Sequence, residues 1–106
     1  MEMPVEVKTY FANGRRSVKS VAAQEDYTLK IVFDNGEIRM YDMKKTLEGQ
    51  AFAPIRTWDR FKEVYIDSSG CIAWDADPNT DSSKVWNNRL DLCPDSCYIY
   101  SRLVEA

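Results

Sequence analysis

Four polar side chains with oxygen atoms stand on alternate positions of the stretch "WDADPNTD": Asp75, Asp77, Asn79 and Asp81. A calcium loop of the EF-hand type has oxygen ligands at positions 1, 3 and 5, glycine at position 6 and glutamate at position 12. Counted from Asp75, the first three positions fit, but position 6 is Thr80 and position 12 is Trp86. The four residues are therefore a weak candidate for calcium. We expect an ordered loop without a required metal, in which Asp and Asn side chains bond to nearby backbone amides.

The three cysteines do not have the spacing of a zinc site. Cys93 and Cys97 are separated by three residues, one more than in a Cys-x-x-Cys motif. Because the chain has no histidine, a structural zinc would need Cys71 and an aspartate, which is an uncommon ligand set. An odd number of cysteines also argues against a disulfide framework. We expect free, buried thiols and no cofactor.

Residues for catalysis are missing from the sequence. The absence of histidine removes the commonest general base and the Ser-His and Cys-His pairs. The chain has no glycine-rich phosphate loop and no Gly-x-Ser-x-Gly elbow. A chain of 106 residues also has little volume for a pocket. We therefore expect that the protein is not an enzyme.

The negative charge is concentrated in one segment. The whole chain has a net charge of −3, whereas residues 67–97 hold six aspartates against Lys84 and Arg89, a balance of −4. Such a segment attracts cationic partners, such as a basic protein surface. We expect another small protein with a basic surface to bind here. The candidate contact residues are Asp75, Asp77, Asp81, Trp86, Asp91 and Asp95.

Aromatic side chains flank this acidic segment, as they do at many protein interfaces. Trp74 and Tyr98 can equally belong to the core, and the pairing expected for Trp74 below favours the core. Trp86 lies in the acidic stretch and is the better candidate for an exposed anchor.

A nucleic-acid regulator is the alternative function, with Arg15, Arg16 and Lys19, and further Lys44 and Lys45, as phosphate contacts. A solvated charged face explains these residues more simply, and a duplex-binding protein usually has a basic stripe. No apolar run approaches the ~20 residues that span a bilayer, and the N-terminus lacks a signal-peptide pattern. We expect a cytoplasmic protein without membrane partners. A homodimer formed through a sheet edge is compatible with these expectations.

The stretch "YTLKIVFDNGEIRMYDM", residues 27–43, predicts a β-hairpin, because apolar and polar residues alternate on both sides of a turn. The Asn35-Gly36 dipeptide is typical of a two-residue type I′ loop. The resulting register pairs Phe33 with Ile38 and Ile31 with Met40, which are apolar on one face.

A second hairpin is predicted in "EVYIDSSGCIAWD", residues 63–75. Ser68-Ser69-Gly70 suits a three-residue loop with glycine in the left-handed position. In this register Ile66 faces Ile72 and Val64 faces Trp74, so the paired face is again apolar.

Short helices are expected around the second hairpin. Before it, every third residue is apolar and Pro54 suits a first helical position; the apolar residues are Phe52, Ile55, Trp58 and Phe61, which we expect in the core. Near the end, Pro94 and Asp95 predict the start of a last short helix. Upstream, residues 4–11 alternate weakly and residues 15–21 predict a further strand. The prediction is a single α+β domain over residues 1–106: a small antiparallel sheet built from two β-hairpins plus N-terminal strands, with short helices packed on one face.

These stretches together resemble a bacterial family known only as the domain of unknown function numbered 2442. The resemblance covers residues 15–101 and rests on "VKSV", "DYTLKIVFDNGEIRMYDM", "AFAPI…F", "CIAWD" and "DLCPDSCYIYS". It implies an α+β fold and no established activity. Stand-alone members lie beside other small proteins in a toxin–antitoxin-like layout, which implies an antitoxin-like or inhibitory partner. Other members precede a helix-turn-helix domain, which this chain lacks, so we expect no DNA binding by that route. The Asp-rich stretch, residues 75–86, is extra relative to shorter members.

Overall fold

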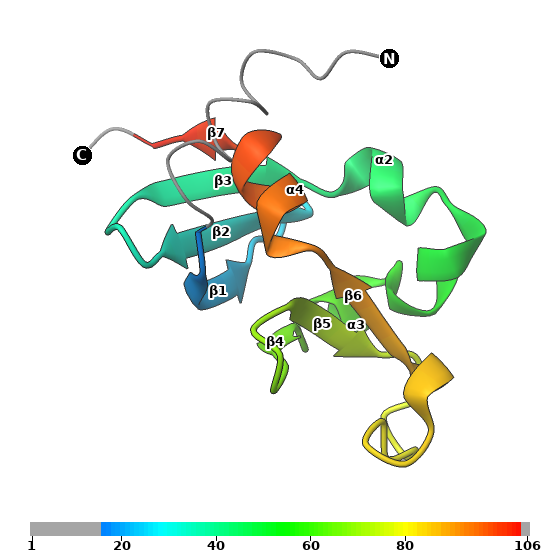
Figure 1. The fold of residues 1–106 in the computed structure, drawn as a ribbon. Coiled ribbons are helices and arrows are strands. Elements are labelled where there is room, and N and C mark those ends of the chain that lie inside the picture. Colours follow the sequence, from blue (N-terminus) through cyan, green and yellow to red (C-terminus); the bar gives the residue numbers. More distant parts are fainter. Residues whose placement is uncertain (1–15, 105–106) are drawn as a thin grey trace, which may run out of the picture.

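The computed structural model describes residues 16–104, which form two small antiparallel sheets with short helices (Figure 1). The first sheet has the strand order β1-β2-β3-β7 and the second has the order β4-β5-β6. The elements are, in chain order, β1 Val18–Ala23, β2 Thr28–Phe33, β3 Ile38–Asp42, α2 Lys44–Leu47, the 3-10 helix η1 Gln50–Ile55, α3 Trp58–Phe61, β4 Tyr65–Ile66, β5 Ile72–Asp75, the 3-10 helix η2 Trp86–Asn88, β6 Arg89–Leu92, α4 Pro94–Ile99 and β7 Arg102–Leu103.

The predicted α+β class and both hairpins are confirmed, but the hairpins lie in different sheets. The strand predicted at residues 15–21 forms as β1 and pairs with β2, while β7 pairs with β3. Both sides of the first hairpin are therefore occupied, and the second hairpin pairs with β6 instead. The strand expected at residues 4–11 lies outside the described residues.

The loop of the first hairpin has three residues rather than the predicted two. The amide of Phe33 donates to the carbonyl of Glu37 (3.0 Å), and the amide of Gly36 donates to the carbonyl of Phe33 (3.0 Å). Gly36 has a φ of +86°, whereas Asn35 does not have a positive φ, so the type I′ turn, which needs two such residues, does not form. The Asn35 carboxamide instead accepts the amide of Glu37 (3.0 Å), which stabilises the longer loop.

The longer loop shifts the predicted register by one residue. Ile31 lies opposite Arg39 rather than Met40, and the ladder places Glu37 beside Phe33. The charged side chains of Glu37 and Arg39 therefore lie on the same face of the sheet as the buried Ile31 and Phe33 of β2. This arrangement is possible because α4 packs on the same face (Figure 1) and its Tyr98 ring lies 5.0 Å from the ring of Phe33.

The second hairpin has the predicted register and loop. Ile66 lies opposite Ile72, and Gly70 ends the three-residue loop with a φ of +85°. Trp74 is fully buried and its indole Nε1 donates to the carbonyl of Phe61 (2.8 Å). Of the two interpretations of Trp74, the core is therefore correct.

The turn between β1 and β2 has the same three-residue loop as the two hairpins, but Tyr27 stands where they have glycine. The amide of Tyr27 donates to the carbonyl of Gln24 (3.0 Å), and Tyr27 has a φ of +65°. This conformation costs a non-glycine residue roughly 1–2 kcal/mol. Contacts of the Tyr27 ring with the rings of Phe61 (5.3 Å between centroids) and Trp58 (6.5 Å) offset this cost.

The predicted aromatic helix is divided into two short pieces, which corrects that prediction. Pro54 falls inside η1 rather than at a first helical position, and Thr57, with φ −84° and ψ 153°, is extended and separates η1 from α3. Ile55 and Phe61 are nevertheless fully buried, as expected. The buried core consists of Leu29, Ile31, Phe33, Met43, Leu47, Ile55, Phe61, Ile72, Trp74 and Cys97.

The last predicted helix forms as α4 with Pro94 at its start. The expectation of buried thiols is correct for Cys97, but Cys71 is partly buried and Cys93 is exposed, since Cys93 precedes the first helical residue of α4 and its side chain makes no capping bond. Within residues 16–104, no helix has the length and apolar character needed to cross a bilayer.

Candidate functional site

The polar side chains of the second sheet gather on the face turned away from the core. Because strand residues alternate between faces, the place of Ile72 and Trp74 in the core cluster puts Ala73 and Asp75 on the opposite face, where Ala73 is also fully buried. Cross-strand pairing adds the neighbours of Ala73 and Asp75 to this face. We call it the outer face, and it comprises Tyr65, Ala73, Asp75, Arg89 and Asp91.

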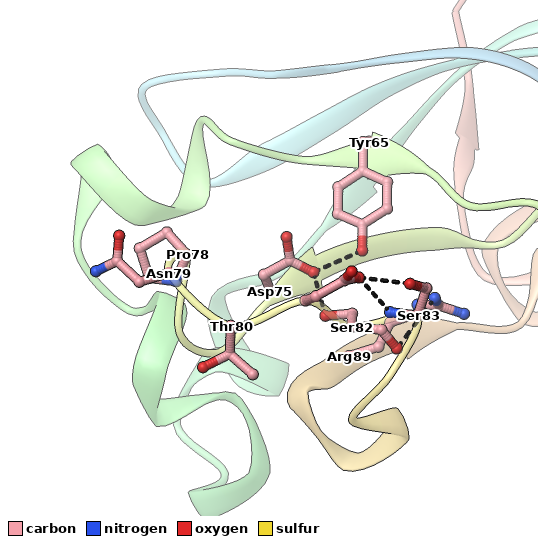
Figure 2. Close-up of a pocket in the computed structure, with 9 residues that line it drawn as sticks. Tyr65, Asp75, Pro78, Asn79, Thr80, Ser82, Ser83 and Arg89 are labelled. Atoms are coloured by element: carbon pink, nitrogen blue, oxygen red, sulfur yellow. Dashed lines mark hydrogen bonds between the residues drawn. The ribbon is translucent and has the colours of Figure 1, made fainter.

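A hollow of about 640 Å³ lies at one end of the outer face, where the loop of residues 76–85 folds over the sheet (Figure 2). Pockets that hold small ligands have volumes of roughly 300–1,000 Å³. The hollow is a shallow, widely open depression rather than an enclosed pocket, and the loop forms a wall that the sheet alone lacks. The hollow, which is open to solvent, is lined by Tyr65, Asp75, Pro78, Asn79, Thr80, Asp81, Ser82, Ser83 and Arg89.

The Asp75 carboxylate has one oxygen engaged and one available. Its Oδ1 accepts hydrogen bonds from the hydroxyls of Tyr65 (2.7 Å) and Ser82 (2.5 Å). Its Oδ2 accepts no hydrogen bond from residues 16–104. Burial raises the pKa of Tyr65, and the hydrogen bond to Asp75 and the charge of Asp75 raise it further, so the hydroxyl remains a donor. The carboxylate is thus fixed in direction, with one oxygen left to bind.

Asn88 holds the loop in place from inside. Its side chain is 8% exposed, and its Nδ2 donates to the carbonyls of Asp77 (3.1 Å) and Thr80 (3.2 Å) and to the Ser82 hydroxyl (2.9 Å). Its Oδ1 accepts the amide of Asp77 (2.9 Å). One buried amide side chain therefore sets the position of Ser82, which in turn orients Asp75.

Asp77 and Asp81 bond to the loop backbone, as predicted. Asp77 accepts the amide of Asn79 (2.9 Å) and the hydroxyl of Thr80 (2.9 Å), and both bonds lower the pKa of Asp77. Asp81 accepts the hydroxyl (2.5 Å) and the amide (2.9 Å) of Ser83 through its Oδ1, which lowers the pKa of Asp81. The Oδ2 of Asp81 accepts no hydrogen bond from the described part of the chain.

The ligands proposed for calcium do not converge, but three other groups do. In the region that the structure describes, ligand atoms of Asp67, Cys71 and Asp91 lie within 4.8 Å of one another, whereas Asp75, Asp77 and Asp81 form no such group. Burial raises the pKa of Cys71, and the neighbouring carboxylates of Asp67 and Asp91 raise it further. These two aspartates are the ones that a zinc site containing Cys71 would use.

Other bonds already constrain this cluster. Asp67 Oδ1 accepts the amides of Ser69 (2.9 Å) and Cys71 (3.0 Å), and its Oδ2 lies 3.8 Å from a guanidinium nitrogen of Arg89. The Asp67 side chain is 3% exposed, so the carboxylate and Arg89 form a partly buried ion pair. A metal ion at this cluster would have to displace the Cys71 thiol proton, whose pKa is raised, and compete with Arg89 for Asp67.

The remaining candidates are scattered. Asp91 is exposed on the outer face, whereas Asp95 lies in the first turn of α4, where the Cys93 thiol approaches its Oδ2 (3.6 Å). The side chain of Trp86 lies outside what the structure describes. Of the predicted partner-binding residues, the structure therefore brings Asp75 and Asp81 together in the hollow and places Asp95 elsewhere.

The phosphate contacts expected for a nucleic-acid regulator are described only in part. Arg15 lies outside the described residues, Arg16 lies 3.6 Å from the Asp34 carboxylate, and Lys19 is exposed on β1. Lys44 lies 3.3 Å from the Asp42 carboxylate.

Sequence comparison assigns the chain to a family. The family described as "Protein of unknown function (DUF2442)" matches residues 18–101. The chain belongs to this family. No curated protein and no solved structure matches the chain significantly.

Two stretches that carry the likeness to DUF2442 meet in space. Tyr98 of α4 donates a hydrogen bond to Glu37, and the Arg39 guanidinium lies 4.5 Å from the centre of the Tyr98 ring. Arg39 also donates to the hydroxyl (2.8 Å) and carbonyl (3.1 Å) of Ser101. We call Glu37, Arg39, Tyr98 and Ser101 the α4 anchor, because these side chains fasten α4 to the first sheet.

Proposed function

We propose that the protein is a non-catalytic binding module of the cytoplasm that docks onto a basic surface of another small protein, in a toxin–antitoxin-like pair. The observation that carries the proposal is the gathering of carboxylates at one end of the molecule. The second sheet and its loop present Asp77, Asp81 and Asp91 to solvent. Arg89 pairs with Asp67, and no lysine or arginine among the described residues forms an ion pair with Asp77, Asp81 or Asp91.

The state of the nucleophiles supports a non-catalytic role. Burial raises the pKa of Cys97 to about 12, and the pKa of Cys71 is also raised, so both thiols are protonated near neutral pH. The Ser82 hydroxyl donates to Asp75 and accepts from Asn88, and it has no neighbouring histidine because the chain has none.

Co-purification with the products of adjacent genes tests the proposal. At native expression and low salt, we expect a stable complex that weakens as salt screens the charges. A double variant, Asp81→Asn with Asp91→Asn, should weaken the complex, because Asn at position 81 can still accept the Ser83 amide while the charge is lost.

A matched control changes exposed charges of the first sheet, Asp34→Asn with Glu25→Gln, and should leave the complex unchanged. Failure to recover any complex with these gene products, or equal weakening by both double variants, would contradict docking through the acidic end.

A further inference from the structure

We infer that the hollow at the end of the outer face receives one arginine side chain of the protein partner, with the Asp75 carboxylate as its main acceptor. This inference rests on the proposed function and specifies how the partner is recognised. It names an anchoring site that is more than a general attraction between opposite charges.

The direction of the Asp75 carboxylate favours a cationic guest. Hydrogen bonds from Tyr65 and Ser82 fix Oδ1, so binding does not have to order the side chain again. The unused Oδ2 belongs to the same carboxylate, which lines the hollow (Figure 2). A charge-assisted bond from a guanidinium is roughly twice as strong as a bond between neutral groups.

The surrounding charges also favour a cation over an anion. Asp81 adds a second carboxylate whose Oδ2 accepts no hydrogen bond from the residues that the structure describes. The positive charge of Arg89 is offset by the nearly buried Asp67, 3.8 Å away. Arg89 itself lines the hollow with a side chain that is 27% exposed, while its Nε is buried without a hydrogen-bond partner in the described structure. An anion would therefore meet the carboxylates of Asp75 and Asp81 and a single guanidinium that already pairs with Asp67.

The walls suit a flat, multiply donating head group. The Tyr65 ring lies beside Asp75, with Pro78 on the loop side of the hollow (Figure 2). A guanidinium stacks on aromatic rings and has five N–H donors in one plane, so it can reach two separate carboxylates. An ammonium has three donors around one point, which makes arginine a better fit than lysine.

The test uses N-acetyl-L-arginine methylamide as a probe and follows the backbone amide signals of the isotope-labelled protein by NMR. We expect saturable shifts confined to Asp75 and residues 79–83. The neutral isostere N-acetyl-citrulline methylamide should cause much smaller shifts. Equal shifts with the citrulline probe, no shifts with tens of millimolar arginine probe, or stronger binding of inorganic phosphate would each overturn the inference.

Variants assign the effect to Asp75. Asp75→Asn keeps an acceptor for Tyr65 and Ser82 but removes the charge, and it should weaken binding of the probe about tenfold. Asp34→Asn, on the far loop of the first sheet, should have no effect. Thermal melts of both variants confirm that the fold is intact. Unchanged binding by a folded Asp75→Asn protein contradicts the assignment.

The two proposals can fail separately. If the arginine probe binds at Asp75 but no adjacent gene product forms a complex, the arginine site stands and the proposed function fails. If a complex forms but Asp75→Asn leaves its affinity unchanged, docking stands and the arginine pocket is wrong.

Discussion

Two regions of the molecule contain the same four kinds of side chain and use them differently. The α4 anchor consists of Glu37, Arg39, Tyr98 and Ser101, and the hollow contains Asp75, Arg89, Tyr65 and Ser82. Each region combines a carboxylate, a guanidinium, a phenol and a hydroxyl. In each, the tyrosine hydroxyl donates to the carboxylate.

The difference lies in how fully the arginine is bonded. Arg39 donates two hydrogen bonds to Ser101, lies on the Tyr98 ring and is 3.6 Å from Glu37. Arg89 makes one long bond of 3.5 Å to the Ser82 carbonyl and lies 3.8 Å from the Asp67 carboxylate, and its Nε has no acceptor among the described residues. In the α4 anchor, which we call the closed cluster, the bonded arginine fastens a helix. In the hollow, the open cluster, charge and space are left for another molecule.

The largest effect should come from breaking the closed cluster. Arg39→Ala removes two hydrogen bonds, a cation–π contact and an ion pair, and should lower the free energy of unfolding by about 2–3 kcal/mol. Urea denaturation measures this loss. Lys30→Ala, an exposed lysine of β2, should change it by less than about 0.5 kcal/mol. A loss below about 1 kcal/mol for Arg39→Ala would show that the anchor does not hold α4.

A smaller effect is expected from the support of the open cluster. Asn88→Ala removes a side chain with four hydrogen bonds to the loop, and should cost about 1–2 kcal/mol because buried backbone groups lose partners. Hydrogen exchange of the amides of Asp77 and Thr80 should quicken. The exposed neighbour gives the control, Asn87→Ala, with no change in either measurement. Unchanged exchange in Asn88→Ala would mean that the loop holds its shape without this residue.

Acid should destabilise the α4 anchor, and a substitution of Glu37 isolates the contribution of this carboxylate. The Tyr98 hydroxyl, with smaller contributions from Asn35 and Arg39, lowers the pKa of Glu37. A lowered pKa stabilises the fold above the unfolded value of about 4.3, and this contribution is lost as pH falls through the folded pKa. Glu37→Gln should therefore be less stable than the natural protein at pH 7, with the difference shrinking towards pH 3. Urea titrations at both values decide this, and a constant difference would exclude the linkage.

The smallest perturbation is chemical labelling of the thiols around α4. Cys93 is exposed and should react with a thiol reagent at neutral pH within minutes. Cys97 is buried, and burial raises its pKa to about 12, so it should react only when the protein unfolds. Mass spectrometry with and without denaturant separates the two sites. Early labelling of Cys97 would show that α4 opens readily and that the anchor is weaker than its contacts indicate.

Local patterns predicted the strands of both hairpins and the turn of the second, because each hairpin is specified within a short stretch of the chain. The Ser68–Gly70 loop and the burial of Ile66, Ile72 and Trp74 follow from alternation and one glycine. The register of the first hairpin was wrong, since Asn35-Gly36 is compatible with two loop lengths and the choice depends on side-chain bonds of Asn35. The split into two sheets depends on long-range pairing, which a local pattern does not contain.

The site was predicted only in part, for a similar reason. The sequence drew attention to Asp75 and Asp81 because acidic residues are conspicuous in a loop. Tyr65, Ser82 and Asn88 were missed, since each becomes important through a partner six to eleven residues away or on another strand. A serine in an acidic loop and an asparagine before a strand give no signal of burial.

The way the sheet ends bears on how this protein can change over evolutionary time. The amide of Ala76 donates to the carbonyl of Asn88 (2.7 Å), so the ladder between β5 and β6 is already closed when the loop begins. Doubling the length of a flexible loop costs only about 0.6 kcal/mol in chain entropy. Insertions between this closing pair therefore leave the strand pairing intact, provided that the loop keeps its bonds to Asn88. This segment can therefore vary while the core and the α4 anchor stay the same.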